Sequence, residues 1–418
     1  MGLLDLSRKL IMKASAIRAV QRIDELGAIS ETDDGLLRQF LSQANLRAAE
    51  KILEWMSLLG MHCEHQADGT IRGILSGSNP TAKPLLLGSH IDTVAHAGKY
   101  DGALGVIAAL AALEDLLESG CTLPFPVHVL GFSDEEGVRF QATYLGSRAV
   151  VAGLDESLLS CRDAAGDALR DVLERDGWHD GAAHFRYAPG DVLGYVELHI
   201  EQGRVLEEAK LPIGVVSGIA GQSRISITLK GQADHAGTTP MPLRRDAMVG
   251  AAACVLAAES LAHAHSPLVA TVGQISLSPN VSNSVPESVK FSLDFRHPDD
   301  EQRVELLDLL SHQFHQIAQQ RDLEIHWQVV QESGAVACDD FLIEKISRAA
   351  KKVTGRCLTL ASGAGHDGVM MQQIGPIGMI FVRCLKGLSH HPDEYCAPED
   401  IAAGIDVLVE FLNSFHEA

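Results

Sequence analysis

Paired cysteines, runs of basic residues and long apolar stretches are all missing from this 418-residue sequence. The eight cysteines lie far apart and form no C-x-x-C pair, so we expect reduced thiols and neither a disulfide framework nor a thiolate metal cage. The 55 acidic residues outnumber the 34 basic ones, which gives a formal charge of −21. Because the sequence has no cluster of Lys or Arg that could bind a phosphate backbone, nucleic acid is not expected as a partner.

Targeting and membrane signals are also missing. No segment approaches about 18 uninterrupted apolar residues, so we expect no membrane contact. The N-terminus lacks an apolar region that ends in a small-residue cleavage site. We therefore expect a cytoplasmic protein.

Several catalytic motifs are absent as well. There is no G-x-S-x-G elbow, which argues against a serine hydrolase. No Walker A motif is present, and Gly102 and Gly105 do not complete a dinucleotide-binding fingerprint. Nucleotide-dependent chemistry is not expected.

The length and the order of apolar runs indicate the fold. A chain of 418 residues exceeds the size at which one core keeps growing, so two domains are expected. Helical spacing of apolar residues predicts a helix over residues 36–60 that ends at Gly60. Strand-like runs then alternate with helix-like stretches: LLLGSH, PVHVLGFS, VLGYVELHI and IGMIFVR are the strands, and GVIAALAALEDLLES is a helix. This alternation predicts an α/β fold with a mostly parallel sheet.

The middle of the chain has a different order of elements. It reads strand, helix, strand, strand, helix, strand, over residues 224–229, 245–261, 268–277, 288–295, 300–319 and 323–330. That order is typical of a ferredoxin-like α+β domain. We therefore expect an inserted domain at 214–332 within a larger domain made of 1–213 and 333–418.

Five segments present histidines or carboxylates near the ends of predicted strands. They are GSHID, KYDG, DEEG, LHIEQG and GLSHHPDE, which supply His90, Asp101, Glu135, Glu136, His199 and His390. Since reactive groups gather at the carboxyl ends of parallel strands, these side chains are expected to converge. Imidazole and carboxylate ligands suit divalent ions such as zinc or manganese.

Each of these residues also has an ordinary structural interpretation when it is taken alone. Asp101 could cap the helix that follows it, and the carboxylates of DEEG could form a solvated turn. The H-x-D pair suggests that Asp92 holds the second ring nitrogen of His90. Of the two glutamates in DEEG, one could bind metal while the other takes a proton from water. The conjunction of the segments, rather than any one of them, favours a metal site.

The ordered motifs resemble the carbamoylase branch of the di-metal aminoacylase and carboxypeptidase family. They are GSHIDTV, GKYDGALGV, DEEGVRF, LHIEQG, GQADHAGTTPM, NSVP, DFRH, SGAGHD, FVRC and SHHPDE, and they extend from about residue 15 to the C-terminus. The resemblance implies a hydrolase with two divalent ions per subunit, Zn²⁺ or Mn²⁺. It implies that His90 and His199 hold one ion, that Glu136 and His390 hold the other, and that Asp101 bridges them. Glu135 is implied as the catalytic base.

The same resemblance implies how substrate is bound. The implied contacts are Gln222, His235, Asn283, Arg296 and Gly365, with His235 also polarising the ureido carbonyl. The inserted domain is implied to act as a lid and to pair two subunits in a homodimer. The implied substrate is a small ureido acid, allantoate, and an N-carbamoyl-L-amino acid is the alternative. A protein that binds ureides without catalysis is the remaining alternative.

Overall fold

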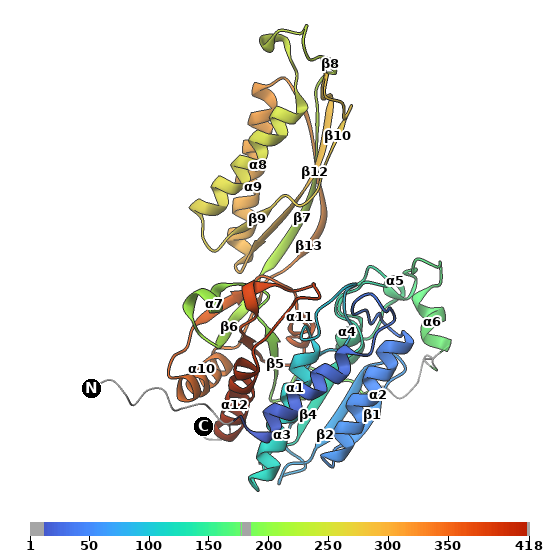
Figure 1. Ribbon diagram of the computed structural model, residues 1–418, viewed down its shortest axis with the longest axis vertical. Helices are drawn as coiled ribbons and strands as arrows, with labels where there is room; N and C mark the ends of the chain where they lie inside the picture. Colours follow the sequence, from blue (N-terminus) through green and yellow to red (C-terminus); the bar gives the residue numbers. More distant parts are fainter. Residues whose placement is uncertain (1–11, 176, 178–184, 416–418) are drawn as a thin grey trace, which may run out of the picture. The chain divides into compact units, whose positions relative to one another are not determined.

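The computed structural model describes residues 12–175, 177 and 185–415, so most of the N-terminal stretch considered for targeting lies outside the described residues. The chain divides into two compact units (Figure 1). Unit 1 comprises residues 1–217, 338–360 and 365–418, and unit 2 comprises residues 218–337 and 361–364.

Unit 1 is built on a mixed sheet whose strands run in the order β1-β2-β4-β3-β5-β16-β6-β14, with β15 paired to β6. The bounds are β1 His62–His65, β2 Ile71–Leu75, β3 Leu85–His90, β4 Val127–Phe132, β5 Gly194–Ile200, β6 Ile213–Ile219, β14 Val336–Ala337, β15 Thr359–Ser362 and β16 Ile377–Val382.

The four central strands of this sheet are parallel. β3 pairs with β4 and β5, and β5 pairs with β16, all in parallel. Every residue of β3, β5 and β16 is buried, as expected for strands covered on both faces. The α/β prediction with parallel strands at its centre is confirmed, while β1, β2 and β6 add antiparallel edges.

Helices of unit 1 pack against these strands and against one another. α3 contacts α1, α12 and β3, and α10 packs on α12. Gly105 lets α3 approach β5 closely, because a Cβ there would lie 2.3 Å from the carbonyl oxygen of Leu198. The bounds are α1 Ala14–Gly27, α2 Gln43–Leu58, α3 Ala103–Glu118, α4 Leu145–Val151, α5 Glu156–Leu159, α6 Leu169–Arg175, α7 Val205–Ala209, α10 Asp340–Thr354, α11 Gly368–Met371, α12 Pro398–Ser414 and the 3₁₀ turn η2 Leu385–Gly387.

The helix predicted over residues 36–60 starts later than expected. Ser42 accepts a hydrogen bond from the main-chain N–H of Asn45 and caps α2, which begins at Gln43. Leu36 instead forms a bridge to Ala97. The apolar spacing over residues 36–41 therefore reflects burial of an irregular segment.

Unit 2 has an antiparallel sheet in the order β10-β12-β7-β13, with β9 paired to β12. Helices α8 and α9 lie side by side on one face of it (Figure 1). The order of the main elements agrees with the sequence prediction, but the strand expected at 268–277 is two strands, β9 and β10, interrupted around Gly273. The short paired strands β8 and β11 were not predicted. The bounds are β7 Gly221–Lys230, β8 Asp234–His235, η1 Met241–Leu243, α8 Ala247–Ala264, β9 Val269–Thr271, β10 Ile275–Ser278, β11 Ser284–Val285, β12 Ser288–His297, α9 Asp300–Gln320 and β13 Glu324–Ser333.

Among the described residues, α8 alone is long and apolar enough to cross a membrane by length and composition. One side of α8 packs on the sheet of unit 2 through Ala251, Cys254 and Ala258. On another side, Val249 and Leu256 are 43% and 61% exposed. Core helices of soluble proteins pass the same test, so α8 is weak support for a membrane span.

Candidate metal centre and active site

Two histidines and a carboxylate from three segments of unit 1 converge at one point. His90 is the last residue of β3, and His199 lies near the end of β5. Asp101 precedes α3, and its Oδ1 lies 3.1 Å from Nε2 of His199 and 3.5 Å from Nε2 of His90. The two Nε2 atoms are 3.5 Å apart. These three atoms could hold one metal ion.

A second group of ligand atoms shares the same aspartate. Oδ2 of Asp101 lies 3.2 Å from Nε2 of His390, which lies 3.3 Å from Oε1 of Glu136. Each oxygen of Asp101 therefore faces a different group. This is the arrangement that a bridging carboxylate requires, and the five residues expected as ligands are brought together.

The imidazoles of the first group are fixed through their other ring nitrogens. Nδ1 of His90 lies 3.2 Å from both the carbonyl and Oδ1 of Asp92, and Nδ1 of His199 lies 2.9 Å from the carbonyl of Ile200. These acceptors place the ring proton on Nδ1 and leave the Nε2 lone pair free for a metal. Asp92 also accepts hydrogen bonds from the main-chain N–H groups of Glu135 and Glu136.

Glycine is required beside the first histidine. Gly102 has a φ of +67°, and a Cβ there would lie 2.5 Å from the ring of His90. A side chain at this position would strain the turn and displace the imidazole. The KYDG motif thus contributes space as well as the carboxylate of Asp101.

Glu135, the residue expected as the catalytic base, directly precedes Glu136 in the chain and lies close enough to His90 and Glu136 to form a metal-type group with them. Its side chain is nearly buried, and burial followed by the charge of Glu136 raises its pKa well above the usual value. Gly365 lies against it, because a Cβ on Gly365 would be 3.5 Å from Oε1 of Glu135 and 2.1 Å from the hydroxyl of Tyr144. Tyr144 lies beside the site and was not expected from the sequence.

Charges within the site are dominated by carboxylates. Burial raises the pKa of Asp134 and Asp367 well above the usual value, and one oxygen of each has no hydrogen-bond partner among the described residues. Hydrogen bonds to Asp101 and then Glu136 raise the pKa of His390 to about 10. Burial raises the pKa of Asp101, but bonds from three histidines hold it well below the usual value. Buried acids at this density are costly unless cations neutralise them, so the donor set fits divalent metal ions.

The substrate residues expected in unit 2 form two pairs. Gln222 on β7 lies opposite Arg296 on β12. Arg296 is already engaged by Asp294, through Nε at 2.6 Å and Nη2 at 2.9 Å, and its Nη1 donates to the carbonyl of Gly363. A carboxylate ligand would therefore share this guanidinium with Asp294.

The second pair lies on the β8–β11 hairpin. His235 pairs with Ser284, and the main-chain N–H of Ala236 donates to the carbonyl of Asn283. Nδ1 of His235 accepts a hydrogen bond from Gly237, which leaves the ring proton on Nε2. The exposed imidazole is thus a hydrogen-bond donor, as polarising a carbonyl requires.

Other residues near the ligands were missed by sequence reasoning. The ring of His366 packs edge-on against His199 with 4.5 Å between centroids, and Glu197, His199 and His366 form a further group of metal-type donors. In the FVRC segment, by contrast, Arg383 pairs with Asp400 through both oxygens and so fastens β16 to α12. The GHD motif could have pointed to His366, because a histidine beside an aspartate in a glycine-rich turn offers two common types of metal ligand. Glu197 gave no such signal, since it looks like an ordinary residue of a buried strand.

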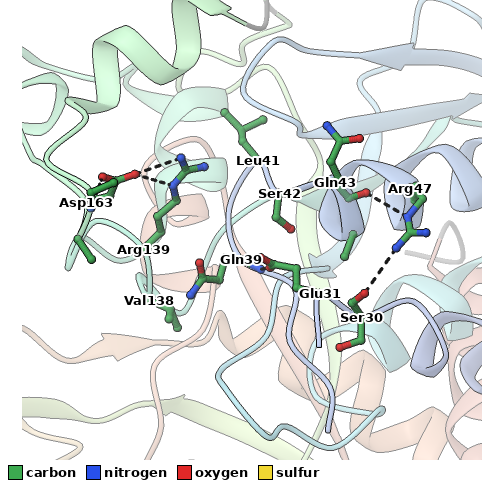
Figure 2. Close-up of a pocket in the computed structure, with 13 residues that line it drawn as sticks. Ser30, Glu31, Gln39, Leu41, Ser42, Gln43, Arg47, Val138, Arg139 and Asp163 are labelled. Atoms are coloured by element: carbon green, nitrogen blue, oxygen red, sulfur yellow. Dashed lines mark hydrogen bonds and ion pairs between the residues drawn. The ribbon is translucent and has the colours of Figure 1, made fainter. Parts of the chain in front are cut away.

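A separate hollow in unit 1, of about 770 Å³, contains none of the expected site residues (Figure 2). Its charged groups are paired within the protein. Arg139 binds Asp163, and Arg47 donates to the carbonyls of Gln43 and Ser30.

Comparisons with known proteins agree with this geometry. The model of peptidase family M20/M25/M40 matches residues 86–414. "Allantoate deiminase" of Arabidopsis thaliana is 40% identical over 95% of this chain and 82% of its own length. "N-carbamoyl-L-amino acid amidohydrolase" of Geobacillus stearothermophilus is 39% identical over 94% of this chain and 96% of its own. The crystal structure of a hydantoinase/carbamoylase family amidase from Burkholderia multivorans is similar with a TM-score of 0.90, at 32% identity over 96% of this chain and 97% of that one.

Proposed function

The chain belongs to peptidase family M20/M25/M40, and from this premise we propose that it hydrolyses the ureido group of allantoate as a step of purine catabolism. The products are ureidoglycine, ammonia and carbon dioxide. The enzyme class, a hydrolase of C–N bonds in ureido compounds, is confirmed by its relatives. The observation that carries the proposal is Asp101, whose two oxygens face two separate groups of metal ligands beside a buried glutamate.

Two divalent cations fit the five ligands, with His90 and His199 on one side of Asp101 and Glu136 and His390 on the other. We expect Zn²⁺ or Mn²⁺. When bound, the cations would polarise the ureido carbonyl and lower the pKa of water. Asp92 keeps His90 and the DEEG main chain in place around them.

Glu135 serves as the general base in this proposal. Its carboxylate takes a proton from the attacking water and delivers it to the departing nitrogen. A carboxyl whose pKa is raised by burial is suited to both steps, because it binds and releases a proton closer to neutral pH. Gly365 lets the hydroxyl of Tyr144 lie close to the main chain beside Glu135, because a Cβ there would collide with that hydroxyl.

Substrate recognition falls to unit 2, which we propose acts as the lid and dimerisation domain. Arg296 and Gln222 would hold the carboxylate of the substrate, while His235 and Asn283 would contact the ureido group and the oxyanion. From Gln222 to Lys230, β7 covers nine residues, and their eight steps span roughly 26 Å. The β8–β11 hairpin lies beyond that end (Figure 1). One small substrate cannot reach both pairs in a single chain.

That separation supports a homodimer in which the two pairs come from different chains. The exposed apolar residues Val249 and Leu256 on α8 offer a surface for a second copy. Met241 and Leu243, both 70% exposed, follow His235 closely in the chain. We therefore propose that each active site takes residues from two subunits. As expected from the sequence, we also propose that the protein acts in the cytoplasm.

The alternative substrate is an N-carbamoyl-L-amino acid, which is favoured by the similarity to the Geobacillus protein. Both substrates need the same cations, base and carboxylate contact. Steady-state assays of protein loaded with Mn²⁺ or Zn²⁺, on allantoate and on several N-carbamoyl amino acids, separate them. A higher kcat/KM for any carbamoyl amino acid would overturn the allantoate assignment. Binding of allantoate without turnover in either metal form would favour a ureide-binding protein instead.

A further inference from the structure

The bridging Asp101 is held by a second carboxylate that is not one of the expected ligands. Glu394 is 4% exposed, and its Oε1 accepts hydrogen bonds from the main-chain N–H groups of Tyr100 at 2.9 Å and Asp101 at 3.1 Å. Glu394 therefore fixes the main chain of a turn nearly 300 residues away in the sequence. No relationship of this kind is visible in the spacing of the motifs.

Ser389 and Gln202 extend this contact to the side chain of Asp101. The hydroxyl of Ser389 lies 2.9 Å from Oε2 of Glu394 and 3.0 Å from Oδ2 of Asp101. Nε2 of Gln202 lies 2.9 Å from the same oxygen of Asp101 and 3.2 Å from Ser389. The network thus joins three segments, each of which also carries an expected metal ligand.

The loop that carries His390 needs such an anchor. His390 has a φ of +54°, which is unfavourable for a residue with a Cβ. The main-chain N–H of Glu394 donates to the carbonyl of His391 and closes the turn. Because His390 lies on a loop and is 49% exposed, whereas His90 and His199 are 2% exposed on strands, its position depends more on this network.

Gly98 provides the space for Glu394. A Cβ on Gly98 would lie 2.3 Å from Cβ, Cδ and Oε1 of Glu394, so any side chain at this position would displace the carboxylate. We call the hydrogen bonds that Glu394 forms with the Asp101 turn and with Ser389 the clamp. A side chain at position 98 would disturb the clamp without removing any of its polar groups. This gives an independent test of the same contact.

We propose that Glu394 is a positioning residue of the metal centre, which sets Asp101 against His390 and thereby determines the affinity of the Glu136–His390 side for its cation. The inference rests on the proposed two-cation function. Loss of the clamp releases the loop and the Asp101 turn together, so the more exposed side loses its ion first. The side formed by His90 and His199 keeps its ion, because both imidazoles are anchored through Nδ1.

The test compares Glu394→Leu, Glu394→Gln and Gly98→Ala in the full-length protein. Each variant is dialysed against graded Mn²⁺, and the bound manganese per chain is measured by mass spectrometry. We expect Glu394→Leu and Gly98→Ala to keep one ion and to weaken binding of the other by about 10-fold to 100-fold, as for other residues that orient metal ligands. Glu394→Gln should stay within about threefold of the original, because its amide oxygen accepts both N–H groups and its NH₂ donates to Ser389.

Glu114→Gln is the matched control, since Glu114 is 5% exposed but pairs with Arg18 and Arg22 on α1. It should lower the melting temperature and leave manganese binding unchanged. Two ions bound with unchanged affinity in both Glu394→Leu and Gly98→Ala would overturn the proposal, as would an equal loss in Glu394→Gln or in the control. If Glu394→Leu does not fold, Gly98→Ala decides alone. Failure of the unmodified protein to bind two ions would refute the two-cation function instead.

Discussion

Replacing Glu135 by glutamine tests the assigned chemistry most directly. The main-chain N–H of Glu135 is held by Asp92 at 3.0 Å, so the isosteric amide should occupy the same position. Glutamine cannot accept a proton from water at its side chain, whereas general-base catalysis typically contributes about 10²-fold to 10⁴-fold. Because Glu135 is 9% exposed, bulk water has little access to replace it as the base. We therefore expect kcat to fall at least about 100-fold.

Ammonia release from allantoate, measured with saturating Mn²⁺, gives kcat and KM for this variant. KM should change less than about threefold, because a base acts in the transition state and not in ground-state binding. Glu201→Gln is a suitable control, since Glu201 is similarly buried but accepts hydrogen bonds from the N–H groups of α7. A kcat of Glu135→Gln within about tenfold of the original would refute the role of Glu135.

Three further outcomes are expected. Asp92→Ala should weaken metal binding by about 10-fold to 100-fold, because the ring of His90 loses the carboxylate that orients it. Isothermal titration measures this affinity, and an unchanged affinity would contradict the role of Asp92. Leu256→Glu should give a monomer in light scattering that binds metal but turns over no substrate, and a fully active monomer would refute the shared site. The folded-state pKa of His390 is raised from 6.5 to about 10, so the stability it contributes to metal-free protein is complete below about pH 6.5 and is lost as the pH rises towards 10. The gain in Tm on adding Mn²⁺ should therefore grow over this range, and a constant gain would contradict it.

The sequence was informative where side chains sit at the ends of buried parallel strands. His90 and His199 could be placed together because β3 and β5 read as mostly apolar strands, and the two strands are indeed buried throughout and parallel. Asp101 and His390 lie in turns, so their placement rested on the resemblance to a known branch of the family. The central strands and the order of elements in unit 2 followed from the same periodicities.

What the sequence did not predict depends on contacts between distant or irregular segments. Glu394 and Gln202 look like ordinary polar residues until the fold brings them to Asp101. The α2 helix starts at Gln43 because a capping serine competes with the apolar spacing before it. Arg296 was expected to contact the substrate, and the sequence did not predict that Asp294, two residues away on the same strand, binds its guanidinium.

The two groups of expected ligands in unit 1 differ in their exposure to solvent, which suggests different roles for them in the proposed function. His90 and His199 are 2% exposed and Asp101 is 4% exposed, whereas His390 is 49% exposed. In the proposed function, a ureido group that approaches from solvent meets the His390 side first, and Glu135 is next to Glu136 in the chain on that side. We therefore propose that the buried side contributes charge and holds Asp101, while the exposed side receives the substrate. The Glu136–His390 side is also the one that we propose Glu394 positions, so both proposals concern the same pair of ligands.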